Sequence, residues 1–245
     1  MRVAVLGLGE AGSRLAADLA EAGVDVAGYD PAVTESKPDV ESAVAESDVV
    51  LSVNSAAVAV GVATTAVPAL RSDAVYADLN TAGPELKRRL GEHVGPTRFV
   101  DVALLGPVPA RGLRTPVLAA GGGASEFADL FVPLGMPVEV VSDAAGDAAR
   151  LKLLRSVFMK GLAAAAIESH TAAAAAGHAE WLDEQIAGVI GRPLLERLLE
   201  GSAQHAGRRV DELEAAKALL LELGVEPRVA DASARLLAGL DETRG

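Results

Sequence analysis

The first thirty residues have the order of two strands joined by a glycine-rich turn and a helix. An apolar segment, 2–6, leads into Gly7-Leu-Gly-Glu-Ala-Gly12, which has the spacing GxGxxG, and a helical pattern follows as far as Gly23. A second apolar segment, 24–29, ends at Asp30. The three glycines allow a sharp turn, a close approach of the backbone to a pyrophosphate, and tight packing of the helix on the sheet. Because the start of a helix offers free amides to phosphates, the sequence predicts a dinucleotide site.

Asp30 indicates which dinucleotide is bound. A carboxylate at the end of the second strand accepts hydrogen bonds from both hydroxyls of an adenosine ribose and repels a 2'-phosphate. No arginine lies between positions 15 and 70, and Lys37 is the nearby cation. We therefore predict NAD as the cofactor, with NADP as the alternative. Asp30-Pro31 would also suit a simple turn.

Strand-like and helical segments alternate as far as residue 141, which predicts a doubly wound, mostly parallel sheet. One of the helical segments, 84–93, begins with a proline and has a charged face. From residue 143 the strands cease, and 148–176 is rich in alanine and lacks proline, so we expect one long helix there. We expect further helices at 179–190, 193–199, 208–223 and 229–240. The predicted fold is α/β, with a Rossmann domain over residues 1–143 and a smaller all-helical domain over 144–245.

Composition excludes several classes of function. A net charge of -12 over 245 residues argues against nucleic acid as a partner, although a local cationic pocket could still bind an anion. The absence of cysteine excludes disulfides and thiolate catalysis, and the four scattered histidines predict no metal site. Charged and polar residues interrupt the alanine-rich stretch 162–179, and the first strand leaves no room for a leader. We expect a soluble, cytoplasmic protein that binds small molecules and no membrane.

Lys152 is the candidate for acid–base chemistry. It lies one turn into the predicted long helix, just after the expected domain joint. A nicotinamide ring handles a hydride, so a neighbouring group must handle a proton. A lysine buried beside a cofactor can have a lowered pKa, which suits both directions of proton transfer. Taken alone, however, a helical lysine is usually a solvated charge.

Four segments resemble, in order, the motifs of the beta-hydroxyacid dehydrogenases, which include 3-hydroxyisobutyrate and 6-phosphogluconate dehydrogenases. They are the turn Gly7–Gly12, Asp78-Leu-Asn-Thr-Ala-Gly-Pro84, Asp101-Val-Ala-Leu-Leu-Gly-Pro107, and Gly146 followed six residues later by Lys152. The resemblance covers almost the whole chain. The second half is more similar to a less characterised, phosphogluconate-dehydrogenase-like branch.

This resemblance implies roles for individual residues. Lys152 matches the family's general acid and base. The positions that match cofactor-binding residues are Gly7, Leu8, Gly9, Glu10, Ala11, Gly12, Asp30, Val53, Asn54 and Thr81.

The chain departs from the family where the substrate is held. Leu105, Gly106 and Pro107 stand where the family has a serine and two glycines, which removes one hydroxyl and one amide donor. Ser156 replaces the asparagine four residues after the lysine, and it can still present a hydroxyl beside Lys152 because residues four apart share a helix face. Three residues remain as candidates for substrate binding: Gly106, Arg111 and Lys160. The two cations, Arg111 and Lys160, would also suit solvated surface positions.

The resemblance therefore implies an NAD(P)-dependent oxidoreductase acting on a small, anionic hydroxy or oxo acid, with Lys152 and Ser156 at the reaction centre. One alternative is an imine reductase-like enzyme, which has a similar architecture. Another is a sensor or scaffold that binds NAD without turning it over. The small side chains of helix 162–176 favour a contact with a second copy, so we expect a homodimer through the helical domain.

Overall fold

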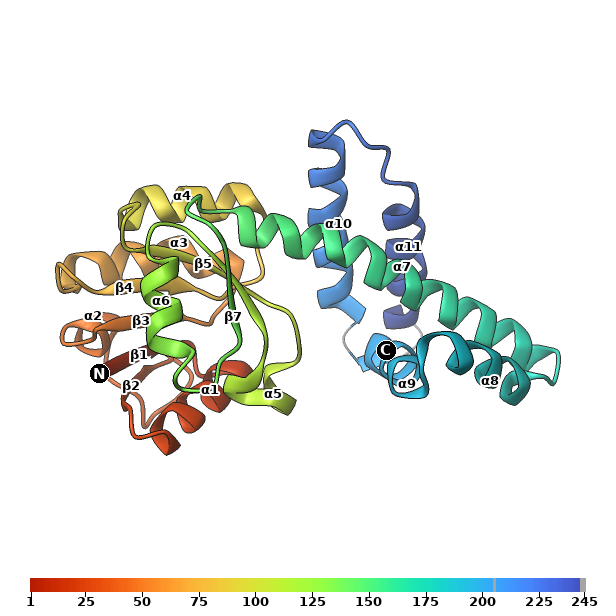
Figure 1. The fold of residues 1–245 in the computed structure, drawn as a ribbon, viewed down its shortest axis with the longest axis horizontal. Helices are drawn as coiled ribbons and strands as arrows, with labels where there is room; N and C mark the ends of the chain where they lie inside the picture. Colours follow the sequence, from red (N-terminus) through yellow and green to blue (C-terminus); the bar gives the residue numbers. More distant parts are fainter. Residues whose placement is uncertain (205, 243–245) are drawn as a thin grey trace. The chain divides into compact units, whose positions relative to one another are not determined.

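The computed structural model describes residues 1–204 and 206–242 (Figure 1). The chain divides into two compact units, Met1–Lys152 and Leu153–Gly245. The first unit contains a sheet with helices, and the described part of the second is helical. The predicted fold class, a Rossmann-type sheet followed by a helical region, is confirmed.

The sheet of the first unit has seven strands in the order β2-β1-β3-β4-β5-β6-β7. Neighbouring strands are parallel except β5 and β6, which are antiparallel, so the sheet is mostly parallel as predicted. The strands are β1 (Arg2–Leu6), β2 (Asp25–Tyr29), β3 (Val49–Ser52), β4 (Val75–Asp78), β5 (Phe99–Leu104), β6 (Val117–Ala120) and β7 (Val138–Ser142).

Helices cover both faces of this sheet. On one face, Leu15 and Leu19 of α1 (Glu10–Glu21) and Phe127 and Phe131 of α6 (Ala124–Phe131) pack on apolar side chains of the strands. On the other face lie α2 (Val40–Val44), α3 (Ala56–Ala66) and α4 (Pro84–Val94). Alternating side chains of the strands supply each core, which is the pattern of a sheet buried on both sides.

Short helical turns complete the first unit. They are α5 (Val108–Arg111) and two 3-10 turns, Val67–Ala69 and Gly112–Arg114. The turns at 108–114 lie in the connection from β5 to β6. Because β6 runs antiparallel to β5, this connection starts and ends at the edge of the sheet where β1, β3 and β4 also end.

The helices of the second unit agree with the predicted pattern. α7 (Asp147–Ala175) begins in the first unit and continues into the second, followed by α8 (Ala179–Ile190), α9 (Arg192–Gln204), α10 (Ala206–Glu222) and α11 (Arg228–Glu242). Leu213 of α10 and Leu237 of α11 are fully buried in its core. In the described part of the chain, no helix combines the length and the hydropathy that crossing a membrane requires.

Candidate active site

The glycine turn after β1 is packed so closely that side chains would not fit at Gly7 and Gly12. Gly7 has φ +103°, and a Cβ there would lie 2.4 Å from the carbonyl oxygen of Val53. A Cβ at Gly12 would lie 1.8 Å from the carbonyl oxygen of Gly7. A Cβ at Gly9 would meet no atom within 4 Å, so the outer side of the turn is open. This cradle fits the pyrophosphate of a dinucleotide, whose charge the amides at the start of α1 would meet.

Asp30 is joined to the same turn. Its Oδ2 accepts a hydrogen bond from the Leu8 amide at 2.7 Å, and its Oδ1 accepts one from the Ala32 amide at 2.9 Å. The carboxylate thus shapes the turn after β2 and also ties β2 to the glycine turn. The residues predicted for pyrophosphate and ribose therefore lie together at one edge of the sheet.

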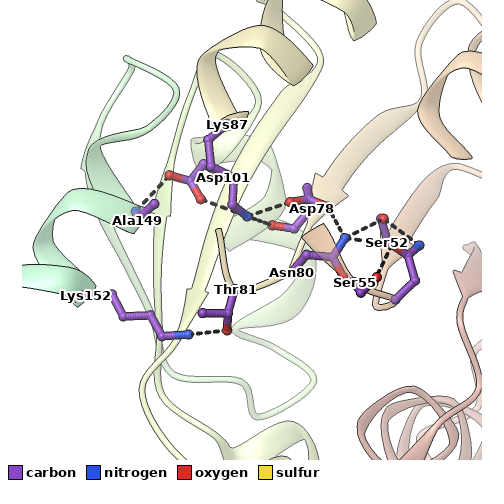
Figure 2. Close-up of polar contacts among 10 residues, drawn as sticks. Ser52, Ser55, Asp78, Asn80, Thr81, Lys87, Asp101, Ala149 and Lys152 are labelled. Carbon is purple, nitrogen blue, oxygen red and sulfur yellow. Dashed lines mark hydrogen bonds and ion pairs between the residues drawn. The ribbon is translucent and has the colours of Figure 1, made fainter. Parts of the chain in front are cut away.

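Asn54 and Asn80 link the loops that follow β3 and β4, and Figure 2 shows the Asn80 side chain directed toward Ser52. The Asn80 side-chain amide donates to Asn54 Oδ1 and to Ser52 Oγ, both at 3.1 Å. Asn54 Oδ1 also accepts from the Ser55 amide at 2.9 Å. These bonds fix the loop that carries Thr81, the next residue along the chain.

Lys152 and Thr81 meet although they are 71 positions apart in the sequence. Lys152 Nζ donates to Thr81 Oγ1 at 2.8 Å, and Figure 2 shows the two side chains pointing toward each other. Thr81 is exposed and Lys152 is half-buried, so the pair is accessible from solvent. An ammonium group is thereby held beside a hydroxyl at the edge of the sheet where the glycine turn lies.

A buried lysine lies behind this pair. Lys87 of α4 is 1% exposed, and its Nζ lies 2.6 Å from Asp78 Oδ2 and 3.2 Å from Asp101 Oδ1. It also donates to the Asp78 carbonyl oxygen at 2.7 Å. Burial lowers the pKa of Lys87, but the two carboxylates outweigh this and hold its pKa above the ordinary value.

Sequence reasoning missed this group, because α4 was expected to present its charges to solvent. The available signal was the pair of acids, Asp78 and Asp101, inside two apolar strands. Two carboxylates buried in neighbouring strands require a cation close by.

The connection from β5 to β6 is fastened to α1. Asp18 Oδ2 accepts from the Leu113 amide at 2.9 Å, and Arg14 donates to the Pro109 carbonyl oxygen at 3.4 Å. Of the substrate residues predicted there, Arg111 is exposed, and a Cβ at Gly106 would lie 3.7 Å from Arg111 Cδ. Gly106 and Arg111 are thus neighbours in this connection.

The other two predicted site residues, Ser156 and Lys160, lie in the second unit with Glu212 of α10. Ser156 Oγ donates to Glu212, and Lys160 Nζ lies 2.8 Å from Glu212 Oε1 and 3.2 Å from Ser156 Oγ. Burial lowers the pKa of Lys160; Glu212 opposes this effect, whereas Arg209 and Arg155 add to it. Sequence reasoning did not anticipate that Glu212 would join this cluster.

The match to a known family decides the class of the protein. Residues 2–130, more than half of the chain, match the NAD binding domain of 6-phosphogluconate dehydrogenase. The chain belongs to this family. Residues 173–240 match a further domain, described as a domain of unknown function (DUF1932). The resemblance to the beta-hydroxyacid dehydrogenases and the nicotinamide cofactor predicted from the sequence are confirmed, and the family is one of NAD(P)-dependent oxidoreductases.

Relatives of this dehydrogenase-like chain extend over both units. The conserved protein MTH1747, described as of unknown function with structural similarity to 3-hydroxyacid dehydrogenases, is 30% identical, with coverage of 100% of this chain and 98% of that chain and a TM-score of 0.76. An uncharacterized 28.5 kDa protein from Methanothermus fervidus is 25% identical over 171 residues, 69% of this chain and 66% of its own length.

More distant structures show the fold alone. The 3-hydroxyisobutyrate dehydrogenase of Mycobacterium tuberculosis is 20% identical, with a TM-score of 0.80 and coverage of 97% of this chain and 92% of that chain. The imine reductase of Streptomyces aurantiacus is 18% identical, with a TM-score of 0.61 and coverage of 99% and 95%. The fold therefore does not distinguish between the two reactions.

Proposed function

We propose that this protein is an NAD-dependent oxidoreductase that interconverts a small hydroxy acid and the corresponding oxo acid, with Lys152 as the general acid and base. The observation that carries the proposal is the 2.8 Å contact between Lys152 Nζ and Thr81 Oγ1 at the edge of the sheet where the glycine turn lies. A proton-transfer group held there is within the region where a dinucleotide binds in sheets of this kind.

NAD would supply the hydride acceptor or donor when it is bound in the glycine cradle. In the oxidative direction the Lys152 amine takes the proton from the substrate hydroxyl, and in the reductive direction the ammonium returns a proton to the carbonyl oxygen. Thr81 restricts the positions of Nζ, because its hydroxyl accepts a hydrogen bond from this group.

We propose that the substrate is anionic and that Arg111 contributes a cation for it. Arg111 is exposed and lies against Gly106, in the connection where Pro107 has removed an amide donor of the family motif. A guanidinium can replace such donors by binding a carboxylate through two parallel hydrogen bonds.

The experiment that tests the role of Lys152 is turnover by the Lys152→Ala variant on panels of small oxo acids and cyclic imines. We expect kcat on an oxo acid to fall by about 10²- to 10⁴-fold, the usual contribution of a general acid or base. Lys217→Ala is the matched control, because it removes a lysine that pairs with Glu214 and Asp231 in the second unit. Retained activity on imines with no activity on oxo acids would instead support an imine reductase.

Titration of the NADH fluorescence separates an enzyme from a sensor. We expect binding of NADH together with turnover of at least one acid in the panel. Tight binding of NADH with no turnover of any compound would contradict the proposed activity and support a protein that only senses the cofactor.

The same titration tests the preference for NAD. The Asp30 carboxylate would repel the 2'-phosphate of NADPH, so we expect NADH to bind at least tenfold more tightly, and Asp30→Ser to reduce that ratio. Equal affinities of the unaltered protein for the two cofactors would contradict the assignment of Asp30 to the ribose.

We also propose that the second unit mediates a homodimer. Large apolar side chains are exposed on its helices, including Phe158 (68%), Trp181 (63%) and Val189 (85%). Exposed apolar surface of this kind is typical of a subunit contact. Sedimentation should show a dimer at micromolar concentration, and replacing Trp181 and Val189 by serine should shift it toward the monomer. A strictly monomeric unaltered protein would contradict this proposal.

A further inference from the structure

We propose that Lys87 and Asp101 are positioning residues, which hold Lys152 against Thr81 from within the core of the first unit. The consequence for turnover rests on the proposed function, whereas the geometry does not. Asp101 begins one of the four shared motifs, but the resemblance assigned no role to Asp101 or to Lys87. Both are buried, Lys87 at 1% and Asp101 at 0% exposure.

Asp101 reaches the helix that carries Lys152. Its Oδ2 accepts a hydrogen bond from the Ala149 amide at 2.9 Å, in the first turn of α7. The amides of the first turn of a helix have no partners within the helix, so a carboxylate placed there both satisfies a donor and favours the positive end of the helix dipole. Lys152 follows three residues later, so this bond sets where its side chain starts.

Asp78 reaches the loop that carries Thr81. Its Oδ1 accepts from the Asn80 side-chain amide at 2.5 Å, and Asn80 directly precedes Thr81. Lys87 contacts both acids, at 2.6 Å from Asp78 and 3.2 Å from Asp101. One ammonium group therefore connects the two chain segments whose side chains meet in the Lys152–Thr81 pair, as Figure 2 shows.

The balance of charge supports a role beyond filling the core. Two carboxylates and one ammonium leave one negative charge in excess at a buried place, which is unfavourable unless other dipoles compensate it. The Asn80 amide and the first turn of α7 supply those dipoles. The network is therefore complete only when the Thr81 loop and the start of α7 are both in place, which couples their positions.

The test uses the Asp101→Asn variant. This change leaves Lys87 paired one-to-one with Asp78, so no buried charge loses its counter-ion. Val102→Ala is the matched control, because Val102 is equally buried in β5 and its truncation loosens the core without removing a polar contact. Asn80→Ala is a second variant, in case Asp101→Asn does not fold. It removes the hydrogen bond between Asp78 and the loop that carries Thr81, without changing any charge.

The first readout does not depend on activity. Lys37, Lys87, Lys152, Lys160 and Lys217 are the five lysines of the chain, so the side-chain NMR signals of ¹⁵N-lysine-labelled protein can be assigned with one Lys→Arg variant each. We expect Asp101→Asn to shift the Lys152 Nζ signal and to speed amide hydrogen exchange at 149–152 by at least tenfold. Val102→Ala should leave the Lys152 signal as in the unaltered protein.

The second readout is turnover. We expect Asp101→Asn to lower kcat by about a hundredfold with KM changed less than threefold, because misplacement of a reacting group has an effect of this size. An unshifted Lys152 signal in folded Asp101→Asn and Asn80→Ala variants would overturn the proposal. Should Lys152→Ala retain full activity, the proposed function fails, while the NMR result still decides the positioning role.

Discussion

Each unit holds a lysine that is largely shielded from solvent, Lys87 fully and Lys160 partly, and the pKa values of the two lysines are shifted in opposite directions. Lys87, in the first unit, faces the carboxylates of Asp78 and Asp101, and its pKa is raised above the ordinary value although burial works against this. Lys160, in the second unit, pairs with the carboxylate of Glu212, and its pKa is lowered because burial outweighs that attraction. Burial alone therefore does not determine the charge of a lysine; the number and sign of its neighbours do.

The difference suggests different uses. Lys87, whose pKa is raised, is suited to link the two carboxylates as a cation. Lys160 is closer to losing its proton, since Arg209 and Arg155 add to the effect of burial. A group whose protonation is easily changed is better suited to a place where a ligand arrives than to a structural core.

The largest effect should come from removing the structural cation. Lys87→Met leaves two buried carboxylates without their counter-ion, and we expect the free energy of unfolding to fall by about 3–5 kcal/mol, measured by urea denaturation. Lys37→Met, at an exposed position, is the control and should change stability by no more than about 0.5 kcal/mol. If Lys87→Met is as stable as Lys37→Met, Lys87 does not stabilise the fold and the contrast with Lys160 fails.

Lys160→Met should have a smaller effect, about 1–3 kcal/mol, because it removes a cation from one carboxylate and Ser156 still donates to that carboxylate. The double variant Lys160→Met with Glu212→Gln should recover most of that loss, since the cation and its carboxylate are then removed together. A double variant less stable than Lys160→Met alone would argue that Glu212 serves another partner.

The dependence of stability on pH should separate the two lysines. The pKa of Lys160 is lowered in the folded state, so the unfolded chain binds more protons, and stability rises with pH up to the unfolded value of about 10.4. The pKa of Lys87 is raised, so its contribution is complete below about 10.4 and is lost as the pH rises through its folded pKa.

This order can be measured by titrating the ¹⁵N-lysine signals. As the pH rises, the Lys160 signal should titrate before the Lys87 signal. Comparison with Lys160→Met should show that the rise in stability below about pH 10.4 is reduced in the variant. The reverse order of titration would contradict the comparison directly.

The smallest effect concerns the cations near Lys160. Arg155 is exposed, so Arg155→Gln should change the free energy of unfolding by less than about 0.5 kcal/mol. It should nevertheless raise the pKa of Lys160 slightly, because one like charge is removed. An unchanged pKa would leave burial and Arg209 as the causes of the lowering.

The sequence predicts the first unit well where one local rule controls the structure. The glycine spacing, the position of Asp30 and the alternation of strands and helices follow from backbone sterics and from periodic burial. The reversal of β6 relative to β5 does not follow, since an apolar run carries no sign of its direction. α2 (Val40–Val44) was also missed, because five residues are too few for a helical period to be visible.

The site was predictable only in part. The family motifs single out Lys152 and Thr81, although neither residue stands out by its own pattern. The contact between their side chains was not predicted. Lys87 could not be told from a solvated lysine without knowing that α4 turns it toward β4 and β5. Glu212 could not be predicted either, because its contact with Ser156 depends on the packing of two helices that are distant in the sequence.

Gly112 limits how the loop between β5 and β6 can vary. Its φ of +55° already favours glycine, and a Cβ there would lie 1.6 Å from the Asp18 carboxylate that holds the neighbouring amide. Under the proposed function, a redesign of substrate preference should leave this anchor intact and diversify the exposed stretch 109–111 before it. Libraries for directed evolution can therefore vary residues 109–111 while Gly112 and Asp18 are kept unchanged.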